Sequence, residues 1–314
     1  MKNAQAIVVL PDSEYGQLSD SDHCHWLSRG DVSPQGAAVE LLVGVLTLLG
    51  VPVPDEGMAA LRFWGQAGHR SGSWMAAADP IHLEARLRDL RIRSLAPGQV
   101  APAELRDLFD TLQGELGEDQ RHSFAKMGMS GYLHSERPIA TASVSAVVAD
   151  GHVPDRFPPS GGSEQVFHQL QGELQMLLHD HEVNIERQKA GQPVINSLWF
   201  WGGGIAPQAV ARPVPDLYSA DPLFNGFWAS CQRPFESFKD FADCRSRSPG
   251  GFVAVVPGNP FHDGLNGLKQ VIGVGGLQRL TLLFRDGVTV SLSRFDRLRF
   301  WRRAVALPGD DSLG

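Results

Sequence analysis

The sequence is poor in the features that define several classes of protein. It has only three cysteines among 314 residues, Cys24, Cys231 and Cys244, which are too few and too scattered for a disulfide framework. No stretch approaches the ~20 apolar residues that a membrane-spanning helix needs. The first residues also lack the long apolar region of a signal peptide. We therefore expect free thiols, a cytoplasmic location and no membrane span.

Positive charge is scarce as well. The chain has 28 Lys and Arg against 35 Asp and Glu, a formal net charge of −7, whereas general nucleic-acid binders have a basic surplus. We therefore expect no nucleic-acid partner. The exception is the stretch 294–303, where arginines alternate with aromatic residues. It either contacts nucleic acid or an acidic lipid surface or, as we expect, packs its aromatic rings on the core and leaves its arginines in solvent.

Apolar runs alternate between strand-like and helix-like patterns. A short apolar run at 6–10 predicts a buried strand that ends at Pro11 and Asp12. Helical spacing predicts helices at 34–49, 57–65 and 102–116. Further elements are expected along the rest of the chain. They are strands at 74–77, 90–92, 194–201 and 251–256, a helix capped by Ser163, a helix at 222–231, and a hairpin of 280–284 with 288–292 around Asp286 and Gly287.

This order of elements predicts an α/β fold. Strands that alternate with helices favour a mostly parallel sheet flanked by helices, and the late hairpin favours an antiparallel edge. Pro- and Gly-rich breaks surround a small α+β segment. We expect residues 1–97 and 161–314 to form the core, and residues 98–160 to form an inserted, cap-like subdomain.

The segment LLHDHEVNIERQKAGQPVINSLWFWGGG, residues 177–204, resembles the archaeal-type cofactor-independent phosphoglycerate mutases. In that family a helix ends in N-x-x-R, followed by Gly and then by Asn before an apolar strand and glycines. A closer resemblance is to a bacterial group described as phosphoglycerate-mutase-like or "regulatory protein, RpfE type". The segments of this chain that resemble that group are residues 78–90, 175–184, 196–204 and 299–303. The residues that carry the family pattern are Asn184, Arg187, Gly191, Asn196 and Gly202 to Gly204.

The resemblance implies the alkaline-phosphatase superfamily, with an alkaline-phosphatase-like core. Its active members hold two divalent metals at the carboxyl ends of the central strands, and these metals stabilise the attacking and leaving oxygens of phosphoryl transfer. They need an early Asp, a Ser or Thr nucleophile, an Asp-x-x-x-His pair, a late Asp-His dipeptide and one more His. No nucleophile can be assigned here by motif.

Only part of this ligand set is present. Asp12 occupies the place of the early Asp. His262 follows the strand 251–256, but Gly258 stands where its paired Asp is expected. The Asp-His dipeptides at 22–23 and 180–181 do not follow a late strand. The residues that remain as metal candidates are Asp12, Asp79, His82, His262 and Asp263. We therefore expect a degenerate metal site without a resident cofactor, or a site for Mn²⁺ or another divalent metal if the protein is an enzyme.

The matched polar residues are candidates for binding a ligand. Arg187 either binds a phosphate or carboxylate through its planar fork or caps helix carbonyls. The glycines either let a ligand approach the backbone or form a tight turn. Asp79 and His82 either share a site or are separate surface residues. The ligand-binding candidates are Asn184, Arg187, Asn196, Gly202, Gly203 and Gly204.

Two hypotheses on function follow. The first is a phosphoglycerate-mutase-like protein with a degenerate metal site, which acts as a non-catalytic or regulatory ligand-binding protein. The alternative is a metal-dependent phosphoglycerate mutase or phosphohydrolase with rearranged ligands. The expected partner is a phosphorylated small molecule or another protein, and the arginine-rich stretch 294–303 is a further candidate for contact with a protein.

Overall fold

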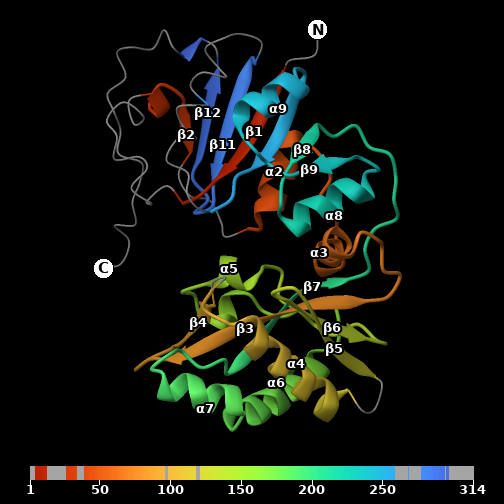
Figure 1. The fold of residues 1–314 in the computed structure, drawn as a ribbon, viewed down its shortest axis with the longest axis vertical. Coiled ribbons are helices and arrows are strands. Elements are labelled where there is room, and N and C mark those ends of the chain that lie inside the picture. The colour runs from red at the N-terminus through yellow and green to blue at the C-terminus, as the bar shows by residue number, and fades with distance from the viewer. Residues whose placement is uncertain are drawn as a thin grey trace. The chain divides into compact units, whose positions relative to one another are not determined.

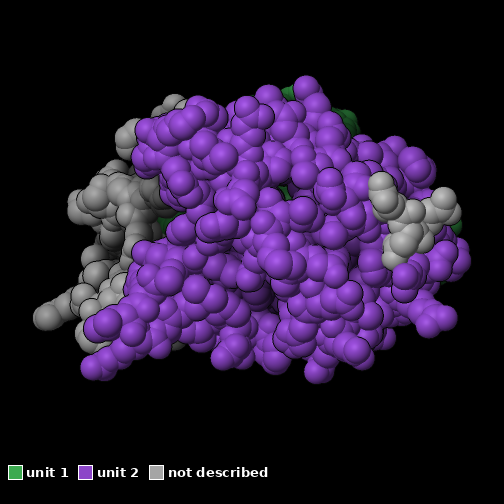
Figure 2. All heavy atoms as spheres, turned by 90° about the horizontal axis from the view of Figure 1, so that it is seen from below, with its two compact units in different colours: residues 1–53, 209–314 green, residues 54–208 purple. Residues whose placement is uncertain are grey.

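The computed structural model forms two compact units. The first unit is Met1–Val53 with Ala209–Gly314, and the second unit is Pro54–Gln208. Figure 1 shows their elements, and Figure 2 shows one face of the second unit. The residues described are 4–12, 26–33, 39–95, 98–117, 121–258, 268, 277–293 and 295–296.

The first unit contains a seven-stranded sheet in the order β2-β12-β11-β1-β10-β8-β9. The strands from β11 to β9 in this order are parallel to one another, and β12 and β2 add an antiparallel edge. The strands are β1 (Gln5–Leu10), β2 (Asp31–Ser33), β8 (Asp216–Tyr218), β9 (Phe235–Glu236), β10 (Gly251–Val255), β11 (Arg279–Phe284) and β12 (Thr289–Ser293).

β1 lies at the centre of the parallel strands. It pairs with β10 on one side and with β11 on the other. Residues 6–10 are fully buried, as expected for an apolar strand covered on both faces. Three described helices accompany this sheet, as Figure 1 shows. They are α2 (Leu41–Leu49), α8 (Pro222–Ser230) and α9 (Phe241–Arg247).

The second unit is built on β3 (Met75–Ala85), β4 (Leu90–Ser94), β5 (His122–Met127), β6 (Ser130–Ser135) and β7 (Ser197–Gly204). α4 and α6 pack on one face of this sheet through a shared apolar core, while α3 lies on the other face, as Figure 1 shows. The helices are α3 (Met58–Ala67), α4 (Pro102–Leu116), α5 (Ala146–Ala149), η1 (Pro154–Arg156), α6 (Glu164–His179) and α7 (Glu182–Lys189).

β3 changes its partner halfway along its length. Residues 75–77 pair with β6 and residues 81–85 pair with β4, whereas β7 runs alongside residues 75–81. Pro80 lies at the change, where it has no N–H to donate to a neighbouring strand. Asp79 is therefore next to a gap in the backbone pairing.

The α/β fold class is confirmed, and so is much of the predicted element order. α4 has the predicted bounds. The Oγ of Ser163 caps α6 by accepting from the backbone N of Val166 at 3.3 Å. The hairpin of β11 and β12 turns at Gly287, where φ is 87°. Cys231 and Cys244 are free and buried, as expected; Cys24 lies outside the described residues.

Several boundaries differ from those predicted. The second unit contains the residues of the predicted insertion, 98–160, together with β3 before them and β7 after them, which pair with each other. The predicted strands at 74–77 and 90–92 are parts of longer strands. β7 extends through Gly204, so the three glycines belong to a strand rather than to a turn after it. The described part of the predicted helix 34–49 becomes helical only at Leu41.

No helix among the described residues is long and apolar enough to cross a membrane.

Gly131 should tolerate no side chain. A Cβ built there would lie 2.1 Å from the Ala78 carbonyl oxygen and 2.2 Å from the ring of Phe109. We predict that Gly131→Ala lowers the free energy of unfolding by about 1–3 kcal/mol, measured by urea denaturation. The control is Gly114→Ala in α4, where no described atom lies within 4 Å of the new Cβ. It should be neutral or stabilising by up to about 1 kcal/mol. Equal effects of the two changes would contradict the packing described.

The buried thiols should be slow to react. Burial raises the pKa of Cys244 to about 12 and also raises the pKa of Cys231, so both stay neutral at pH 8, and the thiolate is the reactive form. In a Cys24→Ser variant we predict that a thiol reagent at pH 8 labels neither cysteine quickly until denaturant is added. Rapid labelling of the folded variant would contradict this prediction.

Candidate functional site

The carboxyl ends of three parallel strands meet in the first unit. The backbone N of Arg285, just after β11, donates to the Leu10 carbonyl at 3.0 Å. The backbone N of Val256, just after β10, donates to the Val9 carbonyl at 3.0 Å. The chain places β10 and β11 on opposite sides of β1, and ligands of open α/β sheets bind at the carboxyl edge where the strand order changes side in this way.

Two side chains of opposite charge lie at this edge. Asp12 follows β1 and is half-buried, while Arg285 is exposed. One Nη of Arg285 lies 3.5 Å from the Val256 carbonyl oxygen, a long contact that holds the side chain weakly. An exposed guanidinium presents a planar fork that matches phosphate and carboxylate. We call Asp12 and Arg285 the carboxyl-edge pair.

Asp79 is held in an ion pair in the second unit. Nη1 of Arg62, on α3, lies 2.8 and 3.1 Å from the two carboxylate oxygens of Asp79. The indole N–H of Trp201 donates to the Asp79 Oδ2 at 2.6 Å. The side chains of Arg62 and Asp79 are only 12% and 18% exposed. Both oxygens of Asp79 are therefore already engaged by protein donors.

Aromatic rings enclose this ion pair. The guanidinium carbon of Arg62 lies 4.9 Å from the Tyr132 ring centroid and 5.2 Å from that of Trp201, within range of cation–π attraction. Burial by itself lowers the pKa of Arg62, but the Asp79 carboxylate outweighs it and raises that pKa above its usual value. Burial raises the pKa of Tyr132, whose hydroxyl donates to the Gln66 side chain at 2.5 Å. The guanidinium of Arg62 is thus kept charged.

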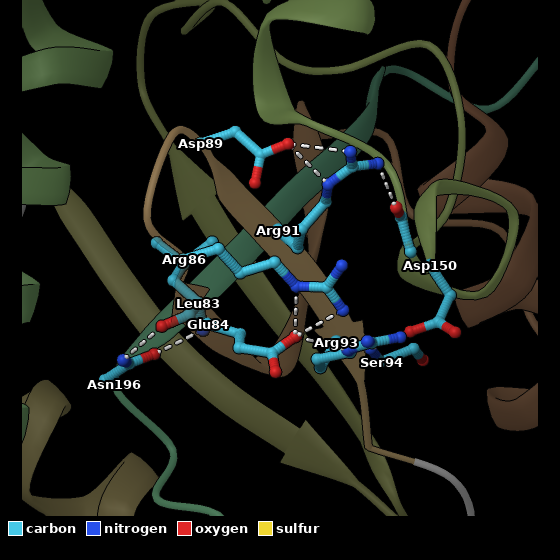
Figure 3. A network of polar contacts seen from close by, with 10 residues as sticks. Leu83, Glu84, Arg86, Asp89, Arg91, Arg93, Ser94, Asp150 and Asn196 are labelled. Carbon is cyan, nitrogen blue, oxygen red and sulfur yellow. Dashed lines mark hydrogen bonds and ion pairs between the residues drawn. The ribbon is translucent and has the colours of Figure 1, made fainter. Parts of the chain in front are cut away.

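His82 and Asn196 join β3 to the segment that leads into β7. Nδ1 of His82 lies 3.0 Å from the Val194 carbonyl oxygen, so this nitrogen carries the proton. The side-chain amide of Asn196 donates to the Leu83 carbonyl at 3.0 Å and accepts from the Leu83 N–H at 2.7 Å, as Figure 3 shows. The Asn196 side chain thereby takes the place of a backbone hydrogen-bonding partner for Leu83, just before β7 begins.

Asn184 and Arg187 are also turned towards the protein. Asn184 is 2% exposed, and its amide bonds to the carbonyls of Leu178 and Ile195 and to the Ile195 N–H at 2.7 to 2.8 Å. Arg187 is 1% exposed and donates to the Pro193 carbonyl, the Gln99 carbonyl and Glu104 at 2.7 to 3.0 Å. These contacts anchor α7 in the second unit.

The three glycines allow close packing within the second unit. The Gly203 carbonyl accepts from the Gly57 N–H at 3.1 Å. A Cβ on Gly203 would lie 2.7 Å from the Trp74 ring, and one on Gly204 would lie 2.4 Å from the Gly57 nitrogen. The close approach that these glycines permit is thus to neighbouring backbone and to an aromatic ring.

The described residues do not match the donor set of a two-metal centre. Within the described ranges, no group of three or more His, Cys, Asp or Glu is placed to hold a metal ion. Asp79 is neutralised by an arginine, which is unfavourable next to a divalent cation. His262 and Asp263 lie outside the described residues. Of the metal candidates, Asp12 alone is placed at the carboxyl edge by the described residues.

Sequence reasoning missed Arg62, Tyr132 and Arg285. No pattern links Arg62 to Asp79, which lie on a helix and a strand 17 residues apart. Arg285 could have been identified from the sequence, because it directly follows the predicted strand 280–284. At that position the family pattern predicts a histidine ligand, whereas this chain has an arginine.

The fold defines an α/β protein, and Asp12 and Arg285 follow two neighbouring strands of its mostly parallel sheet. No family model matches the sequence. The chain is 27% identical over 130 residues to the 2,3-bisphosphoglycerate-independent phosphoglycerate mutase of Methanosarcina barkeri, covering 41% of this chain and 32% of that protein. It is 32% identical over 133 residues to the 2,3-bisphosphoglycerate-independent phosphoglycerate mutase 2 of Methanothermobacter thermautotrophicus, covering 38% of this chain and 30% of that protein.

The similarity therefore spans about a third of the length of these curated relatives. Among solved structures, the cofactor-independent phosphoglycerate mutase of Thermoplasma acidophilum overlaps with a TM-score of 0.41 at 15% identity, covering 93% of this chain and 90% of that one. The chain is thus similar, at low sequence identity, to phosphoglycerate mutases.

Asp79 should matter for stability. Asp79→Asn keeps the shape of the side chain but leaves Arg62 as a nearly buried charge without its counter-ion. We predict a loss of about 3–5 kcal/mol in the free energy of unfolding, measured by urea denaturation. The control is Glu186→Gln, which breaks an exposed pair with Lys189 and should cost less than about 0.5 kcal/mol. A loss at Asp79 as small as the control's would contradict this account.

Proposed function

We propose that the chain is a phosphoglycerate-mutase-like protein of the alkaline-phosphatase type that has a degenerate metal site and acts as a non-catalytic or regulatory ligand-binding protein. Its ligand is a phosphorylated small molecule, bound at the carboxyl edge of the first unit's sheet. The partial similarity to phosphoglycerate mutases supports the ligand class. The observation that carries the proposal is the position of the carboxyl-edge pair beside the central strand β1.

The chemistry of this pair suits a ligand with both a phosphate and a hydroxyl group. Arg285 would donate to phosphate oxygens in charge-assisted hydrogen bonds. The Asp12 carboxylate repels a phosphate and accepts from a hydroxyl, so it would orient the ligand with its phosphate towards Arg285. A phosphorylated hydroxy acid such as 3-phosphoglycerate has both groups.

The second unit supports the non-catalytic part of the proposal. The polar residues that match the family pattern there, Asn184, Arg187 and Asn196, bond to backbone carbonyls and amides of the same unit. Asp79 is bonded to Arg62 and Trp201. These side chains serve the internal structure of the unit through contacts that a ligand or metal would have to break.

Arg285 gives the direct test. We predict that wild-type protein binds 3-phosphoglycerate in calorimetry with EDTA present, and that Arg285→Ala weakens the affinity at least tenfold through loss of the charge-assisted contacts. The matched control is Arg279→Ala at the opposite end of the same strand, which is also exposed. It should leave the affinity within about twofold. Equal effects of the two substitutions, or no binding by the wild type, would refute the proposed site.

The alternative function is a metal-dependent phosphoglycerate mutase or phosphohydrolase. The observation that favours it is Asp12, which follows the central strand just as the early metal ligand of such enzymes would. The other metal ligands would be His262 and Asp263, which follow β10 in the sequence.

Metal binding separates the two functions. The alternative predicts stoichiometric Mn²⁺ binding in calorimetry, lost in Asp12→Asn, together with Mn²⁺-dependent turnover of phosphoglycerate or of a simple phosphate ester. The degenerate-site proposal predicts no binding at millimolar Mn²⁺ and no turnover. Binding that survives Asp12→Asn would count against the alternative.

A further inference from the structure

The first turn of α7 is capped by a histidine. Nδ1 of His181 accepts from the backbone N–H of Val183 at 3.2 Å, the position in which an N-cap side chain satisfies an unpaired helix donor. Nε2 of the same ring lies 2.9 Å from the Thr111 Oγ1 on α4. Because Nδ1 accepts, the proton of the neutral ring is on Nε2, which donates to Thr111.

The same ring fastens one end of a helix pair. α4 and α7 are joined at two points, His181 with Thr111 and Arg187 with Glu104 at 3.0 Å. The order of contacts is reversed along the two helices, so they run antiparallel. The Arg187 end is an ion pair between an arginine and a carboxylate, whereas the His181 end depends on the protonation of an imidazole.

We propose that His181 is a proton-sensitive latch for the first turn of α7. An imidazolium carries N–H groups on both nitrogens and cannot accept from Val183. The positive end of the α7 dipole is a second reason why the cation is unfavourable there. When the ring takes up a second proton at lower pH, the cap is lost and the first turn opens, while the Arg187 end stays attached.

Several titratable and charged groups lie near His181 in the two helices and at the end of α6. His179 is the other imidazole near this helix end. The titratable and charged groups are Asp180 and His179 at the end of α6, Glu182, Glu186 and Arg187 on α7, and Asp107, Asp110 and Glu115 within about a turn of Thr111 on α4.

Hydrogen exchange of the Val183 amide is the test, carried out on the full chain. After correction for intrinsic exchange rates, we expect its protection factor to fall roughly fivefold between pH 7.5 and pH 5.5, in line with the loss of one N-cap. His181→Asn supplies an acceptor that does not titrate, so the fall should disappear. His179→Gln is the matched control and should keep the wild-type pH dependence.

Two outcomes would overturn the proposal. One is a protection factor for Val183 that is the same at both pH values in the wild type. The other is a fall in His181→Asn equal to that in the wild type. A second readout needs no variant, since nitrogen chemical shifts of the His181 ring at pH 7.5 should report a proton on Nε2. A proton on Nδ1 would refute the latch directly.

Discussion

The ion pair between Arg62 and Asp79 joins several elements of the second unit. On one edge of β3, β6 gives way to β4 around Pro80, so backbone pairing is interrupted on that edge while β7 pairs along the other. Arg62 fills this interruption because it bonds to Asp79 and also donates to the Gly131 carbonyl of β6 at 2.9 Å. Trp201 adds β7 to the same carboxylate. One pair of charges thus connects α3, β3, β6 and β7.

The ion pair limits what the Asp79 carboxylate can bind. A nearly buried carboxylate with a guanidinium and an indole N–H on its oxygens is fully solvated by the protein, and removing either partner exposes the other to the cost of desolvation. A metal ion at Asp79 would therefore have to replace contacts that stabilise the second unit. At the carboxyl edge of the first unit, the exposed Arg285 side chain makes a long contact of 3.5 Å to the Val256 carbonyl. That difference is why we place the ligand at the carboxyl edge.

The sequence predicted the elements better than their connections. Local signals are strong for α4, for the Ser163 cap and for the Asp286–Gly287 turn, and each is present in the structure. The extent of β3 was not predictable, because Asp79 and Pro80 favour a break, and it is pairing with the distant strand β7 that carries β3 across these two residues. The roles of Asn184 and Asn196 depend on backbone groups far along the chain, which spacing alone does not reveal.

A crystal structure of the full chain grown with Mn²⁺ and 3-phosphoglycerate tests the central claim most directly. The account predicts phosphate density within hydrogen-bonding distance of the Arg285 guanidinium, with the Asp79 carboxylate still paired to Arg62 and no anomalous manganese peak beside it. Manganese bound jointly by Asp12, His262 and Asp263 with the phosphate on it would contradict the account. It would show that the protein retains the metal centre of a phosphoryl-transfer enzyme.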